Sequence, residues 1–189
     1  MTRVFLDACV LYPPLVRGVI LGAAEAGLFQ PFWSPRVLDE WRLAMARNGG
    51  DVARVEAVIE RMGESFPDAC VAPDPEVEAG IGLPDPADAH VLAGAVAARA
   101  EILLTFNLRD FPARRLAAHG VAARHPDGFL WELLSHAPEA MDAAIRRACA
   151  AAGAEAPGDI RRALKRAKLP RLGKAWEAAK GGSDGRDGG

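Results

Sequence analysis

Residues 83–112 constrain the fold of this chain more than any other stretch, because they predict a helix, a buried strand and a loop in direct succession. Asp85, followed by a proline, is a favourable start for a helix. Apolar residues then recur at helical spacing, and residues 102–105 form a short apolar run typical of a buried strand. One carboxylate, Asp88, therefore lies in the first turn of a helix, and another, Asp110, follows the next strand.

A second apolar run, residues 4–6, ends at Asp7. Because polar residues do not alternate within it, this run predicts a strand buried on both faces of a parallel sheet. Open α/β sheets bind their ligands at the carboxyl ends of the strands, which is where Asp7 would lie. On this segment alone, a turn or cap residue explains Asp7 as well as a ligand does.

Residues 34–45 predict a helix that begins with Ser34 and a proline. At about 100° per residue, Glu40 falls on the border of the apolar face, whereas Asp39 points away from it toward solvent. A carboxylate on that border can reach a cleft. Taken alone, a solvated helix charge is the better interpretation of Glu40.

Strands alternate with helices along most of the chain, which predicts a three-layer α/β/α fold with a mainly parallel central sheet. Residues 67–84 are expected to form an irregular connection with one short strand near residue 70. We expect an α/β domain over residues 1–136, a helical extension over 137–180 that is basic from residue 159, and a disordered tail over 181–189. The basic part of the extension predicts one or two helices.

The overall composition is that of a soluble protein, with 50% apolar and 25% charged residues among 189. The N-terminus lacks the apolar core of a signal peptide, and no apolar run is long enough to cross a membrane. Three scattered cysteines predict neither a disulfide framework nor a zinc site, which fits a reducing compartment. We therefore expect a cytoplasmic protein.

The net charge of −2 conceals an asymmetry along the chain. Residues 1–156 carry 14 arginines, no lysine and 21 acidic residues, which gives a net charge of −7. Residues 157–189 carry 9 basic and 4 acidic residues, which gives +5. The body of the chain is acidic and its C-terminal segment is basic.

Four acidic residues can meet at one edge of the predicted sheet: Asp7, Glu40, Asp88 and Asp110. Four carboxylates around one cleft repel each other strongly unless a cation is bound, so their convergence predicts a metal site. Without a cluster of His or Cys, hard Mg²⁺ or Mn²⁺ is the expected ion. Such sites usually act on phosphate esters.

Three other classes of protein use an aspartate after the first strand, and each is excluded because residues that it requires are missing from this chain. A receiver-type phosphoacceptor needs a lysine after a later strand, and the chain has no lysine before Lys165. A dehalogenase-type phosphatase needs an aspartate at position 9, where this chain has Cys9. A dinucleotide-binding fold needs a glycine-rich turn after the first strand, and residues 8–12 contain no glycine.

Four motifs resemble those of PIN-domain nucleases, in matching order and spacing: VFLDACVLYP, WSPRVLDEW, LPDPADAHVLAGAV and LLTFNLRDFP. The chain is most similar to VapC-type toxins of bacterial type II toxin–antitoxin systems, in a subgroup with a C-terminal helical extension. The likeness covers at least residues 3–136, so the resemblance makes this range a PIN-like nuclease domain. Each motif is weak alone, but four acidic residues in order within an α/β pattern are a specific signal.

The resemblance implies which residues form the site. The residues expected to hold Mg²⁺ or Mn²⁺ are Asp7, Glu40, Asp88 and Asp110. Asn107 is expected to orient ligands or substrate. Ser34 and Asp85 are candidates for supporting roles, although helix capping already explains both. His90 is interpreted as a packed helix residue, and Cys9 replaces the Asn, Ser or Thr of many relatives, so a weaker donor is expected to hold Asp7 more loosely.

The implied activity is endonucleolytic hydrolysis of RNA by metal-activated water, leaving 5′-phosphate and 3′-hydroxyl ends. Because an acidic cleft repels RNA, basic residues elsewhere are expected to bind its backbone. The candidates are Arg109, Arg114, Arg115, Arg161, Arg162, Lys165 and Arg166. A helical segment that completes the core or binds a partner explains the basic extension equally well.

The resemblance also implies a small antitoxin that covers the cleft, and a homodimer, since relatives commonly dimerise. Two alternatives remain open. One is a housekeeping PIN nuclease that processes RNA without an antitoxin, and the other is a PIN-fold module that binds RNA or protein with little cleavage. Retention of all four acidic residues argues against the second, because a binding module gains nothing from clustered repulsion.

Overall fold

The computed structural model describes residues 1–181 and contains a four-stranded sheet in the order β2-β1-β3-β4. The strands are β1 (Arg3–Leu6), β2 (Gln30–Phe32), β3 (Ile102–Leu104) and β4 (Ala122–Arg124). Every neighbouring pair is parallel. The predicted parallel sheet is therefore confirmed, with the two apolar runs of the sequence as its central strands β1 and β3.

The chain divides into two compact units. The first consists of residues 1–12 and 29–125, and includes the whole sheet. The second consists of residues 13–28 together with the chain from Pro126 onward. The family-based boundary after residue 136 stays a prediction.

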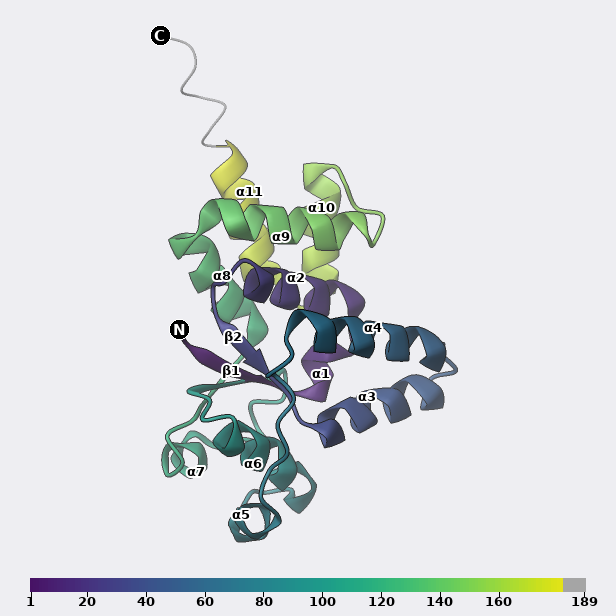
Figure 1. The fold of residues 1–189 in the computed structure, drawn as a ribbon. Coiled ribbons are helices and arrows are strands. Elements are labelled where there is room, and N and C mark those ends of the chain that lie inside the picture. The colour runs from purple at the N-terminus through teal and green to yellow at the C-terminus, as the bar shows by residue number, and fades with distance from the viewer. Residues whose placement is uncertain (182–189) are drawn as a thin grey trace. The chain divides into compact units, whose positions relative to one another are not determined.

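Several helices of the first unit begin after a residue whose side chain caps them. The helices of this unit are α1 (Ala8–Leu11), α3 (Pro35–Arg47), α4 (Val52–Ser65), α5 (Pro75–Gly80), a 3-10 helix η1 (Pro86–Asp88), α6 (Ala89–Ala97) and α7 (Ala113–Ala117). Helices α3 and α4 run side by side (Figure 1). Helix α6 packs on β1 and β3, and Gly94 permits this, since a Cβ there would lie 2.3 Å from the Phe5 ring.

The structure differs from the sequence-based expectation between residues 67 and 99. Helix α5 lies in the connection that was expected to be irregular, where Asp74 caps it and a proline begins it. The short strand expected near residue 70 is a single bridge between Cys70 and Trp33. A 3-10 turn precedes α6, and Arg99 takes a left-handed conformation (φ 49°) beyond the end of that helix.

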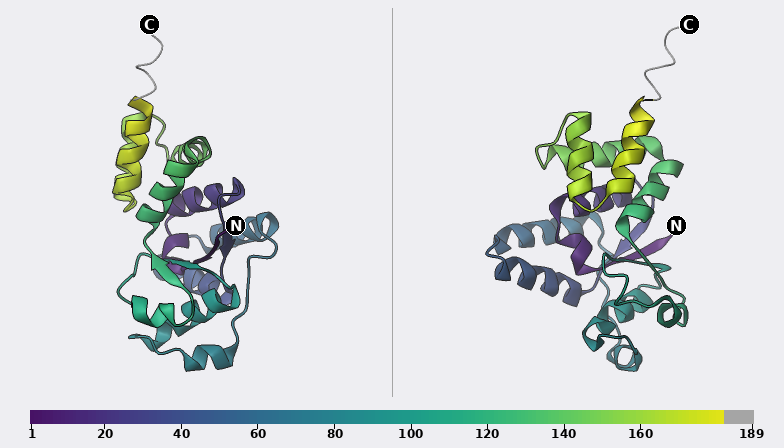
Figure 2. Two further views of the ribbon diagram at one scale, coloured as in Figure 1. Left: turned by 90° about the vertical axis from the view of Figure 1, so that its left-hand side faces the viewer. Right: turned by 180° about the vertical axis from the view of Figure 1, so that it is seen from behind.

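The second unit is entirely helical in its described part. It contains α2 (Pro14–Glu25), α8 (Pro126–His136), α9 (Pro138–Ala150), α10 (Pro157–Arg166) and α11 (Pro170–Gly181). The basic segment therefore forms two helices, α10 and α11, which lie side by side (Figure 2). Residues 182–189 of the predicted disordered tail lie outside the described residues, and Gly181 ends α11. Within residues 1–181, no helix is long and apolar enough to cross a membrane.

Candidate active site

Asp7 lies at the carboxyl end of β1, where α1 begins, and the residue is only 7% exposed. The carboxylate does not cap α1. Instead its Oδ2 accepts hydrogen bonds from Thr105 Oγ1 at 2.7 Å and from Cys9 Sγ at 3.1 Å. Asp7 is therefore held by side chains, which argues against the cap interpretation that the sequence left open.

Thr105 holds both Asp7 and the loop after β3 in place, a role that the sequence did not predict. It is fully buried after β3, donates to Asp7 and accepts from the backbone N–H of Asn107 at 3.0 Å. One hydroxyl thus connects the carboxylate after β1 to the loop after β3. The signal in the sequence was a polar residue that ends an otherwise apolar strand.

Cys9 acts as a neutral donor to Asp7. Burial raises the pKa of its thiol to about 12, and the charge of Asp7 adds to this effect. The sulfur also accepts a hydrogen bond from the backbone N–H of Phe106 at 3.2 Å. A thiol is a weaker donor than a hydroxyl, but Thr105 donates to the same oxygen of Asp7 and compensates for it.

Asp88 shows that the acidic residues influence one another. Its pKa is raised to about 6, first by partial burial and then by the charges of four other carboxylates. These are, in decreasing order of effect, Asp110, Asp85, Asp7 and Glu40. Asp88 stands at the N-cap of α6, yet its side chain caps nothing. Acidic residues distant in the sequence therefore share one electrostatic environment.

The donors of this cluster fit a hard divalent cation, because every one is a carboxylate oxygen and their mutual repulsion favours a positive charge among them. No three His, Cys, Asp or Glu side chains within residues 1–181 form a ligand set. The carboxylates are thus close enough to shift a pKa without being gathered at a common point. The four-carboxylate metal site stays a prediction.

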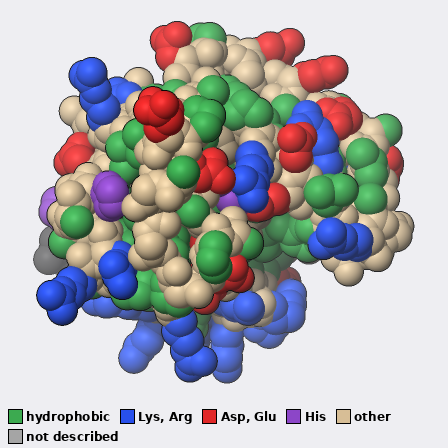
Figure 3. Space-filling model, turned by 90° about the horizontal axis from the view of Figure 1, so that it is seen from below, with side chains coloured by type: hydrophobic (Ala, Val, Ile, Leu, Met, Phe, Trp, Pro, Cys, Tyr) green, Lys and Arg blue, Asp and Glu red, His purple; other side chains and the backbone are tan. Residues whose placement is uncertain are grey.

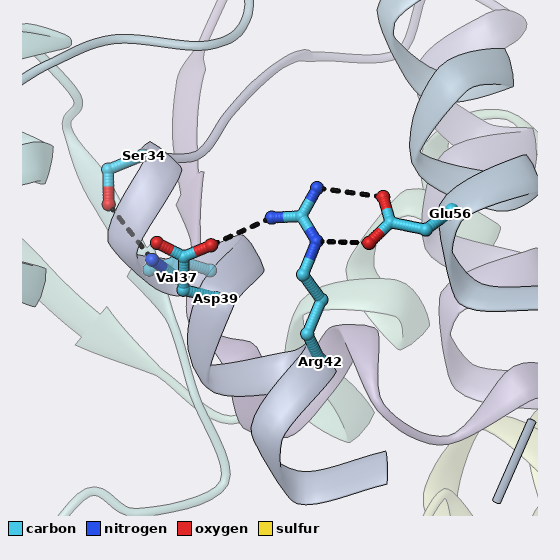
Figure 4. Close-up of polar contacts among 5 residues, drawn as sticks. All are labelled: Ser34, Val37, Asp39, Arg42 and Glu56. Atoms are coloured by element: carbon cyan, nitrogen blue, oxygen red, sulfur yellow. Dashed lines mark hydrogen bonds and ion pairs between the residues drawn. The ribbon is translucent and has the colours of Figure 1, made fainter. Parts of the chain in front are cut away.

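Glu40 and Asp39 take different directions on α3. Glu40 Oε1 lies 2.7 Å from Nε2 of His90, whereas Asp39 is 64% exposed and pairs with Arg42 at 2.9 Å. Figure 4 shows Arg42 between Asp39 and Glu56, so that the same guanidinium connects α3 to α4. The predicted orientation of the two acidic residues agrees with these contacts.

Ser34 and Asp85 both cap helices. Ser34 Oγ accepts from the backbone N–H of Val37 at 3.3 Å, a contact drawn in Figure 4. Asp85 accepts from the backbone N–H of Ala87 at 2.8 Å. Capping therefore accounts for both side chains, as favoured from the sequence, although Asp85 also contributes to the field at Asp88.

Three of the predicted RNA-binding arginines belong to the first unit. Arg114 and Arg115, on α7, line a cavity of about 450 Å³ together with His119. Arg109 lies in the loop before Asp110 and is exposed. Figure 3 shows that basic and acidic side chains both reach the face of the chain seen from below. The first unit therefore contains cationic side chains as well as carboxylates.

A family model described as "PIN domain" matches residues 2–109. The chain belongs to the PIN-domain family. This membership confirms the sequence-based resemblance, and together with the parallel sheet and the C-terminal helices it confirms the predicted fold class. The matched range includes Asp7, Glu40 and Asp88 and ends one residue before Asp110.

A protein of Mycobacterium tuberculosis (strain ATCC 25618 / H37Rv), named "Putative ribonuclease VapC50", is 47% identical to this chain over 58 residues. The alignment covers 31% of this chain and 34% of the relative, so the chain matches about a third of that relative's length. No solved structure matches the chain significantly.

Proposed function

We propose that this chain is a metal-dependent endoribonuclease and the toxin of a type II toxin–antitoxin pair. The observation that carries the proposal is that Asp7, Glu40 and Asp110, from separate parts of the chain, lie near enough to Asp88 for their charges to add to the effect of its partial burial and raise its pKa. A family match and a VapC-type relative support the same class of protein. Mg²⁺ or Mn²⁺ is the cation that the donors suit best.

In this proposal the residues that would hold the cation are Asp7, Glu40, Asp88 and Asp110. Bound there, a divalent cation supplies Lewis-acid polarisation of a phosphoryl oxygen and lowers the pKa of water. Thr105 and Cys9 fix one oxygen of Asp7, which leaves the other oxygen for a ligand. The hydrogen bond from the Asn107 backbone to Thr105 fixes the start of the loop that leads to Asp110.

RNA is the proposed substrate, and its phosphates must approach a cluster of negative charge. Cations beside the cluster reduce that repulsion and contribute to affinity. Arg109, Arg114 and Arg115 are the candidates in the first unit. The second unit adds Arg161, Arg162, Lys165 and Arg166, of which the first two already pair with Glu177 and Asp159.

Neutralising the carboxylates one at a time tests the catalytic part of the proposal. Asp7→Asn and Asp88→Asn should abolish metal-dependent cleavage of RNA and relieve growth arrest in cells that express the chain, because each removes a proposed ligand. Asp39→Asn is the matched control, since it makes the same change beside Glu40 in a residue that pairs with Arg42. Cleavage of total RNA and growth after induction are the measurements.

The control decides between an enzyme and a binding module. Cleavage that survives in Asp7→Asn and Asp88→Asn to the extent seen in Asp39→Asn would contradict the catalytic assignment. The antitoxin is tested separately, by the reading frame beside the gene. A short neighbouring gene for a DNA-binding protein, whose co-expression restores growth, favours the toxin over a housekeeping nuclease.

A further inference from the structure

His90 and Glu40 form a pair that packing alone does not explain. His90 lies on α6 and is 1% exposed, and its Nε2 is 2.7 Å from Glu40 Oε1 on α3. The other ring nitrogen, Nδ1, is buried and has no hydrogen-bond partner among the described residues. A core position that required only volume would be filled at lower cost by an apolar side chain.

The contact from His90 Nε2 orients the Glu40 carboxylate. Because a carboxylate accepts hydrogen bonds, Nε2 carries the proton that the pair shares. Residues on both sides of His90 along α6, from Ala89 to Ala95, are buried, so the ring is fixed by the interior of the first unit. Glu40, in contrast, is 40% exposed and without this contact would sample several rotamers.

We propose that His90 is a positioning residue that holds the Glu40 carboxylate for a divalent cation. This inference rests on the proposed function, since it gives Glu40 a ligand's role. One oxygen of Glu40 is bound to His90 and the other stays available. Hydrogen bonds to ligating side chains fix their orientation, and their removal typically weakens metal affinity about 10- to 100-fold.

Metal affinity without RNA separates this role from a structural one. His90→Leu fills the buried space but lacks a donor, and should weaken Mn²⁺ binding about 10- to 100-fold, measured by calorimetry on the full chain. His90→Gln can place its amide nitrogen near the position of Nε2, and should restore most of the affinity. Val91→Ala is the control, because it shortens a buried side chain of α6 and should lower Tm without weakening Mn²⁺ binding.

A double variant shows whether His90 acts through Glu40. In a Glu40→Gln background, His90→Leu should cause little further loss of Mn²⁺ affinity. If His90→Leu does not fold, His90→Asn replaces it, since its shorter amide does not reach Glu40. Equal affinity of wild type and the donor-less variant would overturn the role of His90 alone, whereas a wild-type chain that binds no Mn²⁺ would overturn the proposed function as well.

Discussion

Polar side chains at helix starts fall into two groups. One group accepts a hydrogen bond from a backbone N–H and so caps its helix; its members are Ser34, Asp51, Asp74 and Asp85. Asp7 and Asp88 also occupy N-cap positions, but neither side chain caps. A carboxylate at a helix start that does not cap the helix keeps oxygen atoms for another use, and both residues are among the four acidic residues that the sequence motifs single out.

In the absence of metal, the folding stability of the chain should depend on pH through the ionisation of Asp88. Its folded pKa of about 6 lies above the value of about 3.9 in an unfolded chain. The folded state therefore binds this proton more tightly, and the group destabilises the fold increasingly as the pH rises from about 4 to about 6. In EDTA, Asp88→Asn should have a higher Tm than wild type at pH 7, and the difference should shrink toward pH 4.

Thermal unfolding of both proteins across this pH range measures the effect. Asp39→Asn is again the control and should show no such rise in Tm, because Asp39 pairs with Arg42 in solvent. A Tm difference between Asp88→Asn and wild type that is the same at pH 4 and pH 7 would contradict the assignment. Addition of Mg²⁺ at pH 7 should stabilise wild type more than the variant.

The acidic residues were predictable from the sequence, whereas their supporting contacts were not. The four carboxylates are recognisable because each follows a strand or stands on a helix of definite pattern. The hydrogen bond from Thr105 to Asp7 spans 98 positions, and the one from His90 joins two helices. Such contacts depend on how elements pack, which local periodicity does not encode.

At the scale of elements, the sequence predicted strands β1 and β3 and helices α3 and α6 within a few residues. Helix α5 and the 3-10 turn before α6 were missed, because their stretch is rich in Pro, Asp and Gly and has no apolar face. Their caps, Asp74 and Asp85, were visible in the sequence. In this stretch the capping residues were therefore better predictors of helix starts than the hydrophobic pattern.

The contact of α6 with the sheet depends on Gly94. A Cβ at this position would lie 2.3 Å from the Phe5 ring and could not be accommodated without displacing it. Gly94→Ala should therefore lower the free energy of unfolding by about 1–3 kcal/mol, the usual cost of overpacking. Displacement of α6 from the sheet would also move Asp88 and His90, so metal affinity should fall with stability.

Gly63 provides the matched control for this substitution. It lies within α4, and a Cβ added there would meet no neighbouring side chain within 4 Å. Gly63→Ala should therefore stabilise the chain by about 0.5–1 kcal/mol through helix propensity. Urea denaturation of both variants measures the two effects. A Gly94→Ala chain as stable as wild type would show that α6 does not require this close approach.

At the scale of the whole molecule, the C-terminal helices contribute to the core of the second unit. Leu164, Leu169, Leu172 and Trp176 are fully buried. Trp176 Nε1 donates to Asp142 on α9 at 2.7 Å, and Lys180 pairs with the same carboxylate. Deleting residues 157–189 would therefore remove core side chains as well as charge, so it does not isolate a role in RNA binding.

Substitutions that change only charge separate the two roles. Lys165 and Arg166 are exposed at the end of α10, and neither side chain forms a hydrogen bond or ion pair in the described part of the chain. If they bind phosphates, Lys165→Gln/Arg166→Gln should weaken RNA binding and reduce the slope of log affinity against log salt by up to about 1.4, at about 0.7 per contact. Tm should not change, because both side chains lie outside the core.

The comparison uses an equal change of charge elsewhere, Arg54→Gln/Arg61→Gln on α4, in which both side chains are exposed. Binding is measured by fluorescence polarisation of a labelled single-stranded RNA in EDTA, with Asp7→Asn in every chain to prevent cleavage. A salt slope that changes equally for both pairs would indicate only the effect of net charge. A slope reduced by the α10 pair alone would mean that the helices that complete the second unit also contact the RNA backbone.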